Sequence, residues 1–127
     1  MTSINHAALY VRDLEAMRDF YVRYLGGVSN DGYHNPNTGL RTYFLSFDGD
    51  ARLEIMQRPG HDAEPASARA GWIHLAFSLG SREAVDDLTA VLRREGYTVL
   101  SGPRVTGDGY YEAAVLDPEN NQVELVG

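Results

Sequence analysis

The sequence predicts an α+β protein built from two similar modules. Stretches in which apolar and polar residues alternate, as expected for half-buried strands, are interspersed with two stretches of helical periodicity. The two halves of the chain also resemble each other at an offset of about 70 residues, which places His6 on His74 and Glu54 on Glu124. Each half is therefore predicted to contain a strand, a helix and then two or three further strands.

The first module is predicted over about residues 1–58. Its opening stretch SINHAALYV alternates, so the side chain of His6 lies on the face opposite the Ala-Leu-Val series. The next stretch, DLEAMRDFYVRYLGG, has apolar residues at helical spacing, with Asp13 as a plausible N-cap and Gly26 at its end. The stretches LRTYFLSF and ARLEIMQ, separated by the turn sequence DGD, predict two strands.

The second module is predicted over about residues 71–127. The strand WIHLAFSL carries His74 on one face, and its other face is expected to pack against the helical layer through Ile73, Leu75, Phe77 and Leu79. The stretch SREAVDDLTAVLRREG predicts a helix with Ser81 as N-cap and Gly96 at its end. YTVLSG, YYEAAVLD and NQVELVG predict the remaining strands, and RPGHDAEPASARAG is predicted to link the modules.

The length, charge and cysteine content of the sequence exclude several kinds of partner and of chemistry. The 127 residues suit one domain, and the stretch at the N-terminus lacks the pattern of a signal peptide. The net charge is −7, and the eleven arginines are scattered without any lysine, which argues against nucleic acid or a membrane surface as a partner. Cysteine is absent, so disulfides, thiolate metal ligands and cysteine nucleophiles are excluded and a cytoplasmic location is expected.

Four ionisable residues are predicted on strand faces turned away from the helices: His6, Glu54, His74 and Glu124. A carboxylate in a sheet interior is costly unless it is paired, and a divalent ion would compensate all four groups at once. Taken singly, a strand histidine is more often a hydrogen-bonded core residue, and a strand glutamate is more often the solvated side of an edge strand. Two His–Glu pairs at equivalent points of a repeat favour a shared metal site.

Three stretches resemble signatures of the vicinal oxygen chelate superfamily, which includes glyoxalases, bleomycin-resistance proteins and dioxygenases: INHAALYVRDLEAMRDFYVRYLGG, GWIHLAFSLGSREAVDDL and AAVLDPENNQVELVG. The resemblance covers essentially the full length. It implies two βαβββ modules forming a curled mixed sheet around a metal cup, and a homodimer. The His-Glu-His-Glu ligand pattern of bacterial glyoxalase I falls on His6, Glu54, His74 and Glu124.

The resemblance to glyoxalase I implies a metal-dependent lyase or isomerase acting on a small carbonyl compound or thiol adduct. It implies one divalent ion per site (Ni, Zn, Co, Mn or Fe), with Glu124 as the first candidate base and Glu54 as the second. Two positions depart from glyoxalase I. Tyr10 stands where that family has an arginine that helps to bind glutathione, and Arg58 stands where it commonly has an asparagine. The substrate therefore stays open.

Two other functional classes remain at this point. A ring-cleaving type of dioxygenase needs two His, one carboxylate and iron, and Glu54 as a fourth ligand counts against it. A non-catalytic binding protein, like the bleomycin-resistance proteins, has no need of four metal ligands. Two residues are candidates for contact with substrate: Arg58, which could hold a carboxylate, and Tyr111, which ends the loop TGDGYY and precedes a strand that leads toward the site.

Overall fold

The computed structural model describes residues 3–63 and 70–127. The chain divides into two compact units, Met1–Ala68 and Arg69–Gly127. Residues 64–69 of the predicted linker lie outside the described residues. Across the described ranges, no helix has the length and apolar character needed to span a bilayer.

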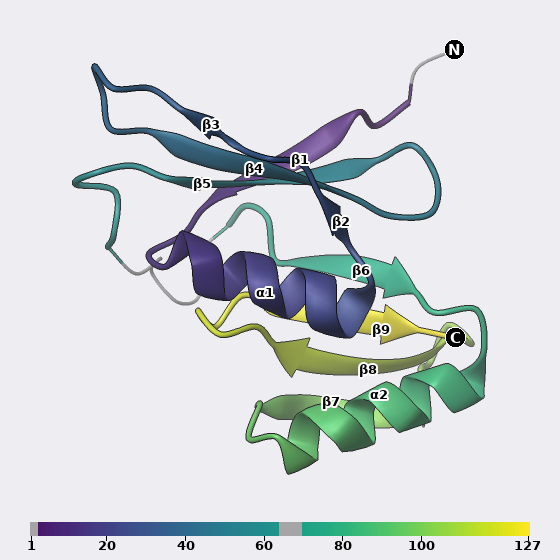
Figure 1. Cartoon of the computed structure of the whole chain (residues 1–127). Coiled ribbons are helices and arrows are strands. Elements are labelled where there is room, and N and C mark those ends of the chain that lie inside the picture. The colour runs from purple at the N-terminus through teal and green to yellow at the C-terminus, as the bar shows by residue number, and fades with distance from the viewer. Residues whose placement is uncertain (1–2, 64–69) are drawn as a thin grey trace. The chain divides into compact units, whose positions relative to one another are not determined.

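Unit 1 contains one helix and one mixed sheet (Figure 1). Its elements are, in order, β1 (His6–Tyr10), α1 (Leu14–Leu25), β2 (Val28–Ser29), β3 (Tyr33–His34), β4 (Arg41–Ser46) and β5 (Arg52–Gln57). The strands are ordered β1-β5-β4-β2, with β3 also paired to β4. β1 runs parallel to β5, and the other pairs are antiparallel. The two-residue strands β2 and β3 were not predicted from the sequence.

Helix α1 begins and ends at the residues that the sequence indicates. The Asp13 side chain accepts a hydrogen bond of 3.1 Å from the backbone N–H of Ala16, which satisfies one of the free donors of the first turn. Gly26 ends the helix at φ 70°, a left-handed conformation that glycine adopts without steric cost. The core residues of unit 1 include Leu14, Met17, Phe20 and Tyr21 from the helix, and Leu45, Leu53 and Ile55 from the sheet.

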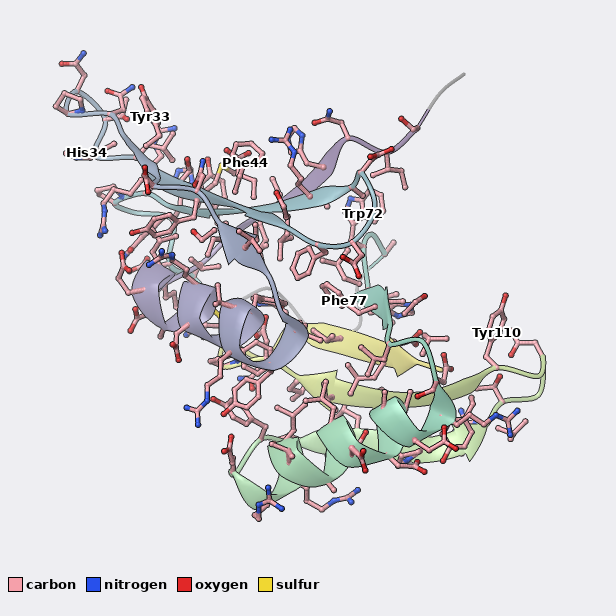
Figure 2. The ribbon with its side chains drawn as sticks, turned by 45° about the vertical axis from the view of Figure 1, so that its right-hand side comes forward. Tyr33, His34, Phe44, Trp72, Phe77 and Tyr110 are labelled. Carbon is pink, nitrogen blue, oxygen red and sulfur yellow. The ribbon has the colours of Figure 1, made fainter. Side chains whose placement is uncertain are left out.

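The two faces of the unit 1 sheet differ in what they contact. Tyr43 reaches α1, where its hydroxyl donates a hydrogen bond of 2.8 Å to Glu15, and Gln57 Oε1 accepts one of 3.4 Å from the Leu14 N–H. The neighbouring residue Phe44 projects from the other face, as Figure 2 shows. Strand alternation places His6, Ala8, Phe44, Arg52 and Glu54 together on this face opposite α1.

Unit 2 is a βαβββ module with a four-stranded mixed sheet (Figure 1). Its elements are β6 (His74–Ser78), α2 (Arg82–Arg94), β7 (Val99–Val105), β8 (Tyr111–Leu116) and β9 (Gln122–Val126), in the sheet order β6-β9-β8-β7. Ser81 caps α2 by accepting from the Ala84 N–H at 3.1 Å, and Val85 and Leu92 of the helix are buried. The α+β class, with one helix and one mixed sheet in each module, is confirmed.

The expected packing role of Ile73 is wrong. Strand β6 begins only at His74, and Trp72 and Ile73 are 93% and 71% exposed (Trp72 is labelled in Figure 2). The reason is the length of the partner strand. His74 lies opposite Gln122, the first residue of β9, so the two preceding residues extend beyond the end of the ladder. Leu75 and Phe77, farther along β6, are half-buried.

Candidate metal centre

Each unit brings one histidine and one glutamate together on the sheet face opposite its helix. In unit 1, His6 Nε2 lies 3.8 Å from Glu54 Oε1. In unit 2, His74 Nε2 lies 3.3 Å from Glu124 Oε2. The two carboxylates are only 17% and 18% exposed, whereas the imidazoles are 38% and 32% exposed. Both pairs thus combine a shielded carboxylate with an accessible ring nitrogen.

The same strand register produces both pairs. Ala8 of β1 lies directly opposite Glu54 of β5, and Ala76 of β6 lies directly opposite Glu124 of β9. The histidine in each case is two residues earlier on the same face, which makes it a diagonal neighbour of the glutamate. Because the residue directly opposite each glutamate has only a methyl side chain, the carboxylate has room to approach the imidazole.

The geometry of each pair suits two ligands of a common ion. Donors that bind one divalent ion at about 2.1 Å each lie no more than about 4.2 Å apart, and both measured separations fall within that limit. Within residues 3–63 and 70–127, no group of three or more His, Cys, Asp or Glu side chains is placed to hold a metal ion. Among the described residues, each unit thus brings together one pair of candidate ligands.

Glu112 is a further acidic residue beside one of these pairs, and the sequence analysis missed it. It precedes Ala114 by two residues on β8, and Ala114 lies directly opposite Glu124. Partial burial raises the pKa of the Glu112 carboxyl, and the charge of Glu124 and a hydrogen bond with it raise that pKa further. The alternation of YYEAAVLD could have placed Glu112 on this face, but only the β8–β9 register makes it a neighbour of Glu124.

Tyr111 lies on the opposite face of β8, against α2. Its hydroxyl donates a hydrogen bond to Asp86 Oδ1, and the guanidinium carbon of Arg82 lies 5.0 Å from the centre of its ring. The hydrogen bond to Asp86 is the main cause that raises the pKa of the Tyr111 phenol, followed by burial. The structure therefore directs Tyr111 toward α2 and away from the face that carries Glu124. Its contact with substrate stays a prediction.

Arg58 lines a surface pocket of about 390 Å³ at the end of β5. Arg12, Arg41 and His61 also line this pocket, and among its described lining residues the three arginines outnumber the one carboxylate, that of Asp62. Of these arginines, Arg41 forms an ion pair of 2.8 Å with Glu15 of α1. The pocket has the charge expected of a site for an anionic group.

Tyr10 connects this pocket to the face of the His6–Glu54 pair. It follows His6 by four residues on β1 and therefore lies on the same face. Its ring meets the imidazole of His61, a pocket residue, edge to face at 4.6 Å between ring centres. The two positions that depart from glyoxalase I, Tyr10 and Arg58, thus belong to one end of the unit 1 sheet.

The chain matches the model of one protein superfamily over nearly its whole length. The model of the Glyoxalase/Bleomycin resistance protein/Dioxygenase superfamily matches residues 3–125. YqjT of Bacillus subtilis, a protein described as uncharacterized, is 36% identical over 128 residues, which cover 97% of each chain. Uncharacterized protein PA2024 of Pseudomonas aeruginosa is 32% identical over 127 residues, covering 97% of this chain and 86% of that protein.

Solved structures agree with the fold. A glyoxalase family protein from Enterococcus faecalis superposes with a TM-score of 0.80 at 27% identity, covering 98% of this chain and 97% of that one. The trypanothione-dependent glyoxalase I of Leishmania major superposes with a TM-score of 0.80 at 22% identity, covering 100% of this chain and 87% of that one. The second likeness is informative about the fold alone.

Proposed function

Because the chain belongs to the glyoxalase, bleomycin resistance protein and dioxygenase superfamily, we propose that it is a metal-dependent lyase or isomerase that moves a proton next to the carbonyl group of a small substrate. The observation that carries the proposal is the repeated His–Glu pair. A protein that only binds a ligand has no need to place an imidazole and a shielded carboxylate at matching points of both units.

The proposed site combines the two pairs around one divalent ion, with His6, Glu54, His74 and Glu124 as ligands. The donor set supports this, because imidazole and carboxylate together suit Zn, Ni, Co, Mn and Fe. When bound, such an ion supplies Lewis-acid polarisation of substrate oxygens.

The proton transfer is assigned to the glutamates. Glu124 takes the proton from the carbon next to the carbonyl, and the electrons of the broken C–H bond move toward the carbonyl oxygen. The same carboxyl group then returns the proton to the former carbonyl carbon. The hydroxyl group on the first carbon becomes the new carbonyl and gives its proton to the former carbonyl oxygen, so the reaction consumes no co-reactant. Glu54 is the second candidate for this base because it holds the equivalent position in unit 1. His6 and His74 act as ligands throughout.

Arg58 is proposed to hold an acidic group of the substrate. Its pocket is lined by three arginines, and Tyr10 links that pocket to the face of the His6–Glu54 pair. We expect Arg58→Met to raise KM with little change in kcat, because a remote contact of this kind binds substrate and transition state equally. The assay should compare the hemithioacetal of glutathione, other hemithioacetals and acyl-CoA epimers.

The decisive experiment compares Glu124→Gln with the wild-type protein. Elemental analysis of wild type after gentle purification should find a bound divalent ion, and Glu124→Gln should lose turnover while keeping part of that ion. Glu83→Gln, on the surface of α2, is the matched control and should behave like wild type. A wild-type protein that is metal-free and ignores added Ni, Co, Zn and Mn would refute the proposed function.

We also propose that the enzyme is a cytoplasmic homodimer. The family resemblance supports the dimer. The lack of cysteine in the sequence supports the cytoplasmic location. Sedimentation velocity at micromolar concentration should give the mass of two chains. A single species with the mass of one chain would contradict the dimer. It would leave the proposed metal site and reaction unaffected.

A further inference from the structure

The surroundings of His6 contain a hydrogen-bond chain that the proposed function does not use. Asn5 Oδ1 lies 2.7 Å from His6 Nδ1, and Arg52 Nη2 donates to the same oxygen at 3.0 Å. The Arg52 backbone N–H also donates to the Asn5 carbonyl oxygen at 3.0 Å. Arg52 lies directly opposite His6 in the β1–β5 register. Arg52 is therefore next to both residues of the Asn5–His6 contact.

The chemistry of the donors determines where the imidazole proton lies. A guanidinium can only donate, so the atom of Asn5 that meets Arg52 must be the amide oxygen. That oxygen can only accept, and it has two lone pairs, so His6 Nδ1 must carry the hydrogen of the second bond. A neutral imidazole has a single N–H group, and its Nε2 is then left with a lone pair. That nitrogen is the one located 3.8 Å from Glu54.

Phe44 keeps these groups in position. The guanidinium carbon of Arg52 lies 4.5 Å from the centre of the Phe44 ring, within the range of a cation–π contact. The same ring meets the imidazole of His6 edge to face at 5.3 Å between ring centres. Phe44 lies opposite Glu54 in the β4–β5 register and projects to the same face (Figure 2). The aromatic ring therefore restricts both the donor and the histidine.

Within residues 70–127, none of these three partners has a counterpart beside His74. The residue before His74 is Ile73, whose side chain offers no acceptor. Gln122 lies opposite His74 where Arg52 lies opposite His6, and Ala114 lies opposite Glu124 where Phe44 lies opposite Glu54. The two His–Glu pairs have the same register but different surroundings.

We propose that Asn5, oriented by Arg52, is a positioning residue that holds His6 in the Nδ1–H tautomer and leaves the Nε2 lone pair directed toward Glu54. The unit 1 pair is then ready to accept a cation without a change of tautomer, whereas the described part of unit 2 shows no equivalent restraint on His74. The part of this inference that concerns metal affinity rests on the proposed function. The part that concerns the tautomer does not.

The tautomer can be measured in the metal-free protein by long-range ¹H–¹⁵N correlation spectra. In spectra recorded at alkaline pH, wild-type His6 should show a protonated Nδ1 and an unprotonated Nε2. Asn5→Ala should move both nitrogens toward the mixed values of a histidine in water. Asn5→Asp keeps an oxygen acceptor and should preserve the wild-type pattern. His74 is the internal reference and should not change in any of these variants.

Arg52→Met tests the second step of the chain. The methionine keeps an apolar stem against Phe44 but has no N–H group, so the amide of Asn5 is no longer required to present its oxygen. The His6 signals should then lie between those of wild type and Asn5→Ala. An unprotonated Nδ1 in the wild-type protein, or unchanged His6 nitrogens in Asn5→Ala, would overturn the proposal.

Metal affinity supplies the remaining readout. Competition with a chromophoric chelator should show that Asn5→Ala binds Zn²⁺ about tenfold more weakly, as expected when a partner of a ligating histidine is removed. Asn5→Asp should bind at least as tightly as wild type. Equal affinities in wild type and Asn5→Ala would reject the positioning role. A wild-type protein that binds no divalent ion would instead refute the proposed function, and the spectra of metal-free protein would still decide the tautomer.

Discussion

Tyr43 and Phe44 show that a shift of one position along a strand changes which face of the sheet a side chain occupies. The two are adjacent on β4, yet Tyr43 donates a hydrogen bond to Glu15 of α1 while Phe44 packs against His6 and Arg52 on the other face. Successive side chains on a strand point to opposite faces, so a shift of one residue would exchange these roles. The candidate site depends on this alternation at every one of its residues.

The phenol of Tyr43 gives a pH-dependent prediction. Its hydrogen bond to Glu15 is the main cause that raises its pKa, followed by burial and the charge of Glu15. A raised pKa in the folded state means that the contribution to stability is complete below the unfolded pKa of about 10 and is lost as the pH rises through the folded value. The stability advantage of wild type over Tyr43→Phe should therefore shrink as the pH rises above about 10.

Denaturant titrations at several pH values measure this difference, and tyrosinate absorbance reports the ionisation itself. Tyr33→Phe is the matched control, since Tyr33 is 57% exposed. An advantage that stays constant through the alkaline range would show that the Tyr43–Glu15 hydrogen bond does not contribute.

At the scale of elements, the helix boundaries follow from local chemistry. Asp13 and Ser81 each accept a hydrogen bond from a backbone N–H three residues later, and both caps are visible in the sequence. Strand ends behave differently, because they depend on the partner strand. The late start of β6 at His74 follows from the first residue of β9, which no local pattern around Trp72 indicates.

Removing the cap of α2 should lower the free energy of unfolding. Ser81→Ala leaves the Ala84 N–H without its acceptor, at a cost of about 1 kcal/mol. Ser81→Asp should retain the stability of wild type because a carboxylate also caps a helix. Urea denaturation of the three proteins makes the comparison, and Ser81→Ala as stable as Ser81→Asp would contradict the role of the cap.

The turn between β8 and β9 depends on Asp117, which is only 3% exposed. Its Oδ1 accepts hydrogen bonds of 2.9 Å from the backbone N–H groups of Glu119 and Asn121. Asp117→Ala should therefore destabilise the protein by about 1–3 kcal/mol, because donors shielded from water lose their acceptor. Asp117→Asn keeps one carbonyl oxygen and should cost less. Thermal denaturation distinguishes the two variants, and an equal loss in both would assign the effect to charge.

At the scale of the whole molecule, the two units share the placement of a His–Glu pair but differ in the residues around it. Both units place a histidine diagonally across from a glutamate, with an alanine directly opposite that glutamate. The neighbours differ, since unit 1 surrounds its histidine with Asn5, Phe44 and Arg52, whereas unit 2 places Glu112 beside Glu124. The pairs supply matched ligands, and their neighbours can give the two halves different roles.

If the pairs share one ion, the protein should bind one ion per chain. His6→Ala and His74→Ala should each weaken Zn²⁺ binding, and the double variant should lose little more than either single variant, because residues that act on one site are not additive. Zn²⁺ at one hundred times its dissociation constant should stabilise wild type by about 2.7 kcal/mol. Elemental analysis and thermal melts with and without chelator test this. Two ions per chain with additive losses would mean that each unit binds its own.

Much of the fold could be predicted because its signals are local. Helical spacing, the caps and the internal repeat placed α1, α2 and the longer strands, and alternation placed the two His–Glu pairs on faces opposite the helices. The short strands β2 and β3 were not predicted, because two residues are too few to show the alternation of a strand. Tyr111 was singled out for its place after a loop, but its face is set by the pairing of β8.

The sequence by itself determined which residues form the helices, where these helices begin and end, and that two His–Glu pairs occupy equivalent points of a repeat. Only the tertiary structure decided which side chains meet across strands. The contacts of Arg52 with Asn5, of Phe44 with His6 and of Glu112 with Glu124 depend on register. A period of two specifies the face of a residue, but its neighbour across the sheet is specified only when the strands pair.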